Sequence, residues 1–315
     1  MVSYVEALGV SGCPVKILDI RSRYAPAPTG FLHLGHVVNA IYVWGVTRRL
    51  GGTVLLRIED HDRQRSRAQY ESEILEDLAW LGFGADGNPV RQSERGEVYA
   101  AALEKLRERG LVYACACSRA EIAAYRSPHV PAVDDELRYP GTCRDRGIAD
   151  RRGVGLRVRL EPTVERFVDL RHGPQEQRPA EQCGDLLVRD RDGNWTYQFA
   201  ATVDDLAQGV THVIRGDDLL ESTGRQIQLA RFLGRAEPPR FLHHALIMKS
   251  PTQKLSKSDR DTGVRELRAQ GWTPERVIGY AAALVGLLPQ GETLRASEVS
   301  SIIQVDVSEL SERSR

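Results

Sequence analysis

Residues 23–36 of this chain read Arg23-Tyr-Ala-Pro-Ala-Pro-Thr-Gly30, then Phe-Leu, then His33-Leu-Gly-His36. A short apolar run precedes this stretch at residues 15–24, and residues 35–50 carry apolar side chains at helical spacing. The order predicts a buried strand, a rigid Pro/Gly loop and a helix. Because a helix N-terminus offers free N–H groups and a positive dipole end, the stretch is typical of a polyphosphate site.

Strand and helix signals continue to alternate after this first unit. The glycine pair at 51–52 ends the helix, residues 53–58 predict a second strand, and residues 69–81 predict a second helix. This order is the start of an open parallel α/β sheet of the Rossmann type.

The alternation breaks at residue 114 and resumes at residue 185. The intervening segment is rich in Cys, Pro, Arg and Gly, with a short strand-like run at 154–160, and is interpreted as an insertion. Strands and helices are then expected at 185–197, 210–215, 222–233, 243–248 and 273–287, the last with Thr273 as N-cap. The expected domains are 15–113, the first half of a Rossmann catalytic domain; 114–184, the insert; 185–244, the second half; and 245–315, a lysine loop with a C-terminal helical region.

Composition sets the broad class of protein. The chain has 315 residues and 41% hydrophobic residues, enough for about two domains with a real core. Lys+Arg and Asp+Glu are equal at 43 each, so a nucleic-acid contact must come from a local patch. Six arginines between Arg144 and Arg159 form one such patch, for which a solvated surface is an equal explanation. We expect no membrane span and no signal peptide, and a cytoplasmic location.

The five cysteines are odd in number and clustered, which indicates a reduced chain with a metal site. They are Cys13, Cys115, Cys117, Cys143 and Cys183.

A second motif, Lys254-Leu-Ser-Lys-Ser258, lies more than two hundred residues after the first. Lys254 and Lys257 can follow a moving pyrophosphate as point charges, and His33 and His36 can donate hydrogen bonds to phosphate oxygens. Gly35 leaves room for an adenine against the backbone. Each motif alone is also compatible with an ordinary loop, but the two together predict one ATP held between two ends of a single fold.

These motifs resemble those of class I aminoacyl-tRNA synthetases of the glutamyl type. The first and second motifs resemble the two class I signatures, and three further blocks lie between them in the family's order: Leu56-Arg-Ile-Glu-Asp-His-Asp62, Tyr197-Gln-Phe-Ala-Ala-Thr-Val-Asp-Asp205 and Thr211-His-Val-Ile-Arg-Gly-Asp-Asp218. The resemblance implies a Rossmann-type parallel-sheet catalytic domain that uses ATP with Mg²⁺. It also assigns the site. For catalysis it implies His33, His36, Lys254 and Lys257; for ATP, His33, Gly35, His36 and Lys257; for glutamate, Arg23, Tyr24, Ala25, Pro26, Ala27, Glu59, Tyr197 and Arg215.

The chemistry of this block suits a small acidic amino acid. Arg23 and Arg215 can form forked hydrogen bonds to carboxylates, Glu59 can hold the α-ammonium group, and Tyr197 can donate its hydroxyl. One departure concerns Ala27, because the family usually has Ser at this position. The missing hydroxyl is expected to weaken contact with the amino acid.

The length of the chain points to one branch of the family. After Lys257 only 58 residues remain, too few for a large anticodon-binding domain, so a short C-terminal helical region is expected instead. The chain therefore resembles the truncated branch, the glutamyl-queuosine tRNA(Asp) synthetases. This implies a monomeric ligase that activates L-glutamate without tRNA and transfers it to queuosine in the anticodon of tRNA(Asp).

The same branch implies a zinc-containing insert. Cys115-Ala-Cys117 and Tyr139-Pro-Gly-Thr-Cys143 resemble its zinc site, which implies one Zn²⁺ per chain on Cys115, Cys117, Tyr139 and Cys143. Cys13 and Cys183 are interpreted as packing cysteines.

Three alternatives remain from the sequence. The first is a compact glutamyl-tRNA synthetase that charges the 3′ end of tRNA(Glu). The second is a small-metabolite adenylyltransferase, which also uses a His-x-Gly-His motif but would not need the Arg215 block or the zinc insert. The third is a zinc-containing RNA-binding module without activity, against which the intact histidine and lysine motifs argue.

Overall fold

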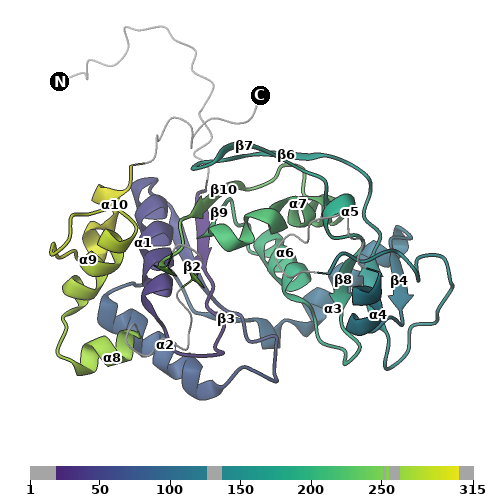
Figure 1. The fold of residues 1–315 in the computed structure, drawn as a ribbon, viewed down its shortest axis with the longest axis horizontal. Helices are drawn as coiled ribbons and strands as arrows, with labels where there is room; N and C mark the ends of the chain where they lie inside the picture. Colours follow the sequence, from purple (N-terminus) through teal and green to yellow (C-terminus); the bar gives the residue numbers. More distant parts are fainter. Residues whose placement is uncertain (1–18, 126–136, 251–252, 255–262, 305–315) are drawn as a thin grey trace, which may run out of the picture.

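The computed structural model describes residues 19–125, 137–250, 253–254 and 263–304 (Figure 1). Its main layer is built from two groups of hydrogen-bonded strands. The first group is parallel, in the order β1-β2-β3: β1 (Arg21–Tyr24), β2 (Thr53–Ile58) and β3 (Val90–Arg91). The second has the order β7-β6-β10-β9: β6 (Glu165–Asp169), β7 (Gly173–Gln177), β9 (His212–Gly216) and β10 (Arg240–His244). Its pairings are parallel except for the antiparallel β6–β7 hairpin.

Strands β1 and β9 join the two groups. The backbone N–H of Thr211, directly before β9, donates to the Arg21 carbonyl at 2.9 Å. Inside the sheet, the Arg23 guanidinium donates to the Ile214 carbonyl at 3.3 Å. The connections diverge from this point, since β2 follows β1 on one side and β10 follows β9 on the other. In an open α/β sheet, such a switch point opens a crevice at the carboxyl ends of the strands.

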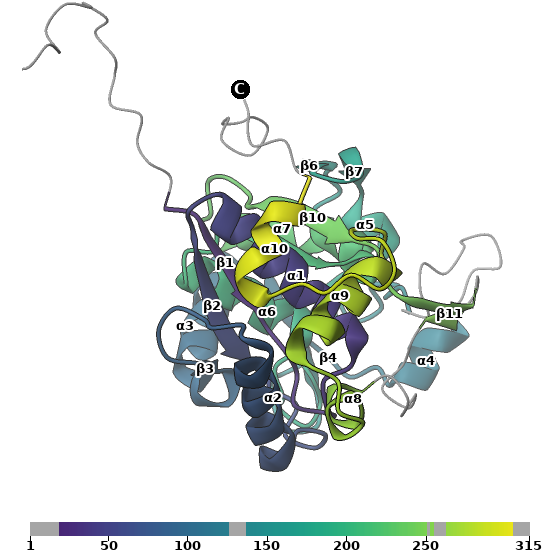
Figure 2. The same ribbon diagram turned by 90° about the vertical axis from the view of Figure 1, so that its left-hand side faces the viewer.

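Helix α1 (Leu34–Arg49) packs along the sheet and is covered in turn by α9 (Pro274–Leu284) and α10 (Val299–Ile302) (Figure 2). The C-terminal region also contains α8 (Val264–Ala269), which packs against α9, and the short η4 (Ala296–Glu298) before α10. At Gly45 the helices approach closely, because a Cβ there would lie 2.6 Å from Cγ1 of Ile303.

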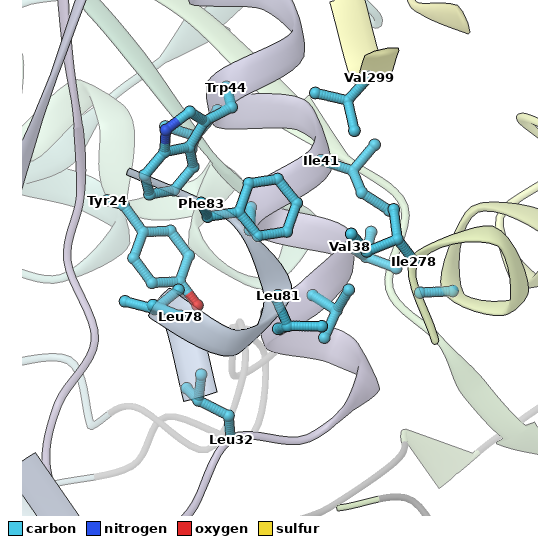
Figure 3. Close-up of a cluster of buried hydrophobic side chains, with 14 of the residues drawn as sticks. Tyr24, Leu32, Val38, Ile41, Trp44, Leu78, Leu81, Phe83, Ile278 and Val299 are labelled. Carbon is cyan, nitrogen blue, oxygen red and sulfur yellow. The ribbon is translucent and has the colours of Figure 1, made fainter. Parts of the chain in front are cut away.

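The first hydrophobic core lies around α1. Figure 3 shows Tyr24 and Trp44 beside Phe83, and Val38 and Ile41 facing Ile278 and Val299. Helix α2 (Ala68–Leu81) closes this core with Leu78 and Leu81. The packing places β1 against the start of α1, and this positions the loop between them.

A second core lies under a small antiparallel sheet, in the order β4-β5-β8. The strands are β4 (Val112–Cys115), β5 (Gly155–Val158) and β8 (Leu186–Arg189), and the main helices around it are α3 (Gly96–Glu108), α6 (Tyr197–Ala207) and α7 (Thr223–Phe232). Shorter elements complete the described chain: η1 (Gln92–Glu94), α4 (Arg119–Ala124), α5 (Pro179–Gln182), η2 (Asp217–Ser222), β11 (Met248–Ser250) and β12 (Gln253–Lys254).

Several predicted elements are confirmed. The strand at 53–58 is β2, the helix at 35–50 is α1 within one residue at each end, and the Thr273 side chain accepts a hydrogen bond from the Arg276 N–H as the N-cap of α9. The strand expected at 243–248 is wrong in position, since β10 spans Arg240–His244. Its pairing with β9 sets this range, because His244 lies opposite Gly216, where β9 ends.

Strand pairing crosses the boundary expected at residue 184. The β6–β7 hairpin belongs to the predicted insert by sequence but pairs with β10, whereas β8 belongs to the predicted second half but pairs with β5. Strand pairing alone does not define domains, so the expected limits at residues 113, 184 and 244 stay a prediction. No helix in the described part of the chain is both long and apolar enough to cross a bilayer.

Candidate active site

A cavity of about 800 Å³ opens at the carboxyl ends of β1, β2, β9 and β10. It brings together eleven predicted residues: Arg23, Tyr24, Ala25, Pro26, Ala27, His33, Gly35, His36, Glu59, Tyr197 and Arg215. These residues come from β1, α1, α6 and β9 and from the loops after β1 and β2, so the cavity is a product of the tertiary fold. The sequence analysis missed further lining residues, namely Asn39, Arg65, Ile214, Gly216, Asp218, Leu219, His244, Leu246 and Ile247.

The two histidines are held by the first turn of α1. The His33 Nδ1 accepts from the Gly35 N–H, and the His36 Nδ1 accepts from the His33 N–H, both at 3.1 Å. This reciprocal pair is a capping box in which histidines replace the usual Ser and Glu. Since both Nδ1 atoms accept, both rings carry their proton on Nε2 as neutral imidazoles.

The surroundings of the histidines favour an anion. The first turn of α1 contains no acidic residue, so nothing on the helix offsets its positive dipole end. The two imidazole rings lie side by side, with centroids 4.0 Å apart. Two neutral imidazoles at a helix N-terminus can donate hydrogen bonds to phosphate oxygens and so stabilise their negative charge.

Arg215, in β9, is a buried cation held by neutral acceptors. Its nitrogens donate to His243 Nε2 at 2.9 Å, Gln226 Oε1 at 2.6 Å, Thr223 Oγ1 at 2.8 Å and the Leu219 carbonyl at 3.2 Å. Among the residues that the structure describes, no carboxylate forms an ion pair with it. Burial lowers the pKa of Arg215, yet a guanidinium remains charged.

Arg23, in the neighbouring strand β1, is held by a carboxylate and not by neutral acceptors. Its Nε donates to Asp205 Oδ1 at 2.9 Å, and the same oxygen accepts from Arg57 at 2.7 Å. Arg57 is fully buried and also pairs with Glu59 at 3.1 Å. The charges of Arg23 and Glu59 are therefore already offset within the protein, whereas that of Arg215 is not.

Asp205 anchors this network, and its ionisation has a measurable consequence. Burial opposes ionisation, but Arg23 and Arg57 outweigh it and lower the pKa of Asp205 from 3.8 to about 2. A depressed carboxyl pKa contributes stability above the unfolded value, and this is lost as pH falls through the folded value. Asp205→Asn is thus expected to lower the free energy of unfolding by about 2 kcal/mol at neutral pH, with a difference that narrows from pH 4 downward.

Urea unfolding of both proteins at a series of pH values checks this prediction. A difference between wild type and variant that stays constant from pH 7 to pH 3 would contradict it.

Tyr197, at the start of α6, is half-buried and lines the cavity near Arg215. Burial and the nearby Glu59 raise its pKa, while Arg215 and Arg23 act against them. The hydroxyl therefore stays protonated at neutral pH and is available as a donor.

A second cavity of about 820 Å³ reaches the other side of Tyr197. Its lining also includes Thr196, Gln198, Cys115, Cys117 and Arg157. Tyr197 therefore lines both the predicted substrate cavity and the cavity that contains two of the clustered cysteines.

The predicted metal ligands come together in the small sheet. The Sγ atoms of Cys115, Cys117 and Cys143 all lie within 4.8 Å of one another, and Tyr139 Oη is 3.4 Å from Cys115 Sγ. Zinc–sulfur bonds of about 2.3 Å in a tetrahedron separate the sulfurs by roughly 3.8 Å. The donor set therefore fits a tetrahedral zinc ion with little adjustment.

The hydrogen bonds of this cluster favour a thiolate at Cys143, whereas burial raises the pKa values of Cys117 and Tyr139. Burial acts against ionisation of Cys143, but hydrogen bonds from the Ala116 backbone and the neighbouring side chains lower its pKa to about 7. A thiolate is the form of cysteine that binds metal. Cys183, in contrast, is buried in the second core with its Sγ donating to the Pro179 carbonyl, as a packing cysteine would. Cys13 lies outside the described residues.

The arginine-rich stretch divides into structural and exposed members. Arg144 pairs with Asp185, Arg159 pairs with Asp145, and Arg157 is buried with its guanidinium 3.7 Å above the Tyr139 ring. The exposed ones are Arg146, Arg151 and Arg152. The surface patch is therefore about half as large as the sequence indicated.

The lysine motif is largely beyond what the structure describes. Lys257 lies outside the described residues, and Lys254 is placed only as part of β12, without its side chain. Their predicted role at the phosphates stays a prediction.

Comparison with known proteins gives a consistent picture. The family described as tRNA synthetases class I (E and Q), catalytic domain, matches residues 19–314. A Glutamyl-Q tRNA(Asp) synthetase of Symbiobacterium thermophilum is 40% identical over 298 residues, which covers 90% of this chain and 92% of that protein. A glutamate–tRNA ligase of a Synechococcus species is 40% identical over 293 residues, 91% of this chain but 61% of the ligase.

A solved structure has the same fold. The crystal structure of a glutamate tRNA ligase from Elizabethkingia meningosepticum, in complex with its amino acid, matches with a TM-score of 0.73 and 27% identity. The match covers 92% of this chain and 65% of that one, so this chain spans about two thirds of the solved ligase.

Proposed function

This chain belongs to the family of class I tRNA synthetases (E and Q), and on that premise we propose that it activates L-glutamate with ATP, without tRNA, and transfers the glutamyl group to queuosine in the anticodon of tRNA(Asp). The observation that carries the proposal is Arg215, a buried cation without an ion-pair partner among the described residues, at the wall of an 800 Å³ cavity. A carboxylate ligand would offset this charge, and burial strengthens the attraction.

In the first step, a glutamate carboxylate oxygen attacks the α-phosphorus of ATP and pyrophosphate leaves. Arg215, Arg23 and Tyr197 hold the acidic substrate, Glu59 faces its ammonium group, and the Tyr24–Ala27 loop forms the floor of the site. The Nε2–H groups of His33 and His36 donate to the phosphate oxygens as charge develops. Lys254 and Lys257 act on the departing pyrophosphate, and Mg²⁺ supplies further charge stabilisation when bound.

In the second step, a hydroxyl of queuosine attacks the carbonyl carbon of the adenylate, AMP leaves, and the hydroxyl proton passes to solvent or to the leaving phosphate. No described side chain is an evident general base, so catalysis rests on positioning of a reactive adenylate. The cysteine-bearing insert and the exposed arginines of the 144–159 stretch are proposed to hold the anticodon arm.

Two assays test the proposal in sequence. Glutamate-dependent ATP–pyrophosphate exchange is expected in the absence of tRNA. If no exchange is found, the proposed tRNA-independent activation of glutamate is wrong. Transfer of labelled glutamate is then measured to tRNA(Asp) with and without queuosine and to tRNA(Glu). Labelling of only the queuosine-containing tRNA(Asp) supports the proposed acceptor, whereas labelling of the 3′ end of tRNA(Glu) would replace it with the compact glutamyl-tRNA synthetase.

We also propose that Cys115, Cys117, Cys143 and Tyr139 hold one zinc ion per chain. The purified protein is expected to contain about one equivalent of zinc, and Cys117→Ser is expected to lower this content strongly, since a hydroxyl is a poor ligand for zinc beside thiolates. Elemental analysis of both proteins measures the effect. Cys183→Ser, outside the cluster, is the matched control and should keep the wild-type zinc content; equal zinc in all three proteins would contradict the assignment.

A further inference from the structure

A buried acid–imidazole pair lies directly behind Arg215. His243, in β10, accepts from the Arg215 Nε–H on its Nε2 at 2.9 Å, and its Nδ1 lies 2.7 Å from Asp169 Oδ2 at the end of β6. Asp169 and His243 are 1% and 0% exposed, and neither is among the residues that line the substrate cavity. Asp169, His243 and Arg215 thus form a chain of hydrogen bonds across three adjacent strands, from β6 through β10 to β9.

The hydrogen bonds define which atom carries the proton. Asp169 Oδ1 accepts from the backbone N–H groups of Arg171 and His172, and Oδ2 accepts from the backbone N–H of His243. A carboxylate with three backbone donors stays ionised, and its pKa is lowered although burial acts against this. Nδ1 of His243 therefore carries the proton, and Nε2 faces Arg215 with a lone pair.

Arg23, the other predicted glutamate-binding arginine of the cavity, forms the direct ion pair that Arg215 lacks. Arg23 is oriented by the carboxylate of Asp205, which also offsets its charge. Arg215 is oriented by an imidazole that is neutral, because burial lowers the pKa of His243. The imidazole ring lies between the Asp169 carboxylate and the guanidinium. The Arg215 side chain is therefore oriented without a direct ion pair to Asp169.

We propose that Asp169 and His243 are positioning residues that aim Arg215 into the cavity while leaving its charge uncompensated, and that they thereby set the preference of the site for an acidic over a neutral amino acid. The inference rests on the proposed activation of glutamate and adds a determinant of its selectivity. Neither residue contacts the substrate; both act through Arg215.

The test uses glutamate-dependent ATP–pyrophosphate exchange with the full chain. His243→Leu removes the acceptor for Arg215 and is expected to raise the KM for glutamate about ten- to a hundred-fold, with the KM for ATP unchanged. The ratio of kcat/KM for glutamate over glutamine is expected to fall about ten-fold or more, because a misaimed guanidinium no longer favours the charged side chain.

Two further variants separate this role from packing. His243→Gln gives up the bond to Asp169 but places its amide carbonyl near the position of Nε2, where it can accept from Arg215, so it is expected to stay within about three-fold of the wild-type KM for glutamate. Asp169→Asn keeps the shape but presents an NH₂ donor to Nδ1. This turns His243 into the other tautomer, whose Nε2–H opposes the Arg215 Nε–H, and the expected loss matches that of His243→Leu.

His212→Leu is the control, because His212 is a buried histidine in β9 whose Nδ1 is hydrogen-bonded to Thr211 and which does not line the cavity. It should leave the glutamate KM and the glutamate/glutamine ratio at wild-type values.

The outcomes separate the two levels of the argument. A wild-type protein without glutamate-dependent exchange contradicts the proposed function and this inference with it. A wild-type protein with exchange, combined with an unchanged glutamate KM in His243→Leu and Asp169→Asn, overturns the inference alone. Parallel rises in the KM values for glutamate and ATP would also overturn it, since they indicate a general structural role. If His243→Leu does not fold, the contrast between His243→Gln and Asp169→Asn decides by the same criteria.

Discussion

Replacing Arg215 by methionine is expected to raise the KM for glutamate by about 10²–10³-fold, because the substrate carboxylate would enter a buried site without its counter-charge. Methionine keeps much of the length and apolar volume of the arginine stem, so the cavity wall stays filled. The maximal rate at saturating ATP should change much less than the KM, since the guanidinium is not among the groups at the phosphates. Steady-state exchange over a wide range of glutamate concentrations measures both quantities.

A second readout does not depend on activity. Glutamate binding stabilises the folded state by mass action, so the thermal midpoint of the wild-type protein should rise with glutamate concentration, and this rise should vanish in Arg215→Met. Arg235→Met is the matched control, because Arg235 is half-buried and donates to the carbonyls of Val210 and Glu237 away from the cavity. If Arg215→Met kept the wild-type KM for glutamate and the wild-type thermal shift, the assignment of Arg215 to the substrate carboxylate would be wrong.

Asparagine at both His33 and His36 is expected to lower the maximal exchange rate by about 10²–10³-fold, because in the proposed mechanism each imidazole supplies an Nε2–H donor to the phosphates. Asparagine is chosen because its carbonyl oxygen can replace Nδ1 as the acceptor of the capping box, while nothing replaces Nε2. The free energy of unfolding should therefore stay close to the wild-type value, and the KM for glutamate should change little. Exchange kinetics and urea unfolding are the measurements.

Glutamine at the same positions is expected to have the opposite effects on the exchange rate and on the free energy of unfolding. Its amide NH₂ lies near the position of Nε2 and keeps a donor, but the cap is lost at a cost of about 1 kcal/mol for each position. More activity and less stability than in the asparagine variants are thus expected. Asparagine variants with wild-type rates would show that the histidines serve only to cap α1.

Local patterns in the sequence were sufficient for the elements that carry the first motif. The strand at 53–58, the helix beginning beside His33 and the Thr273 cap depend on periodicity and on contacts within a few residues, and the structure confirms them. Eleven of the twenty residues that line the cavity were also identified, because the motifs that contain them follow the strand ends, whereas the other nine were missed.

Pairings between distant segments could not be read in this way. The β6–β7 hairpin lies within the irregular insert, and only its register with β10 shows that it extends the main sheet. The position of β10 was misjudged for the same reason, since the end of its neighbour β9 limits it and the apolar run continues beyond that point.

The amino-acid sequence by itself determined the class of fold and the chemical types available to the site: two histidines at a helix start, arginines near strand ends, and a cysteine–tyrosine set in the insert. Only the tertiary structure decided how each charge is used. Arg23 and Arg215 are the same residue type in similar motifs, yet one faces Asp205 and the other faces the neutral ring of His243. That difference depends on which strands are neighbours in the sheet, and the strength of a buried charge depends on its neighbours and not on its position in the chain.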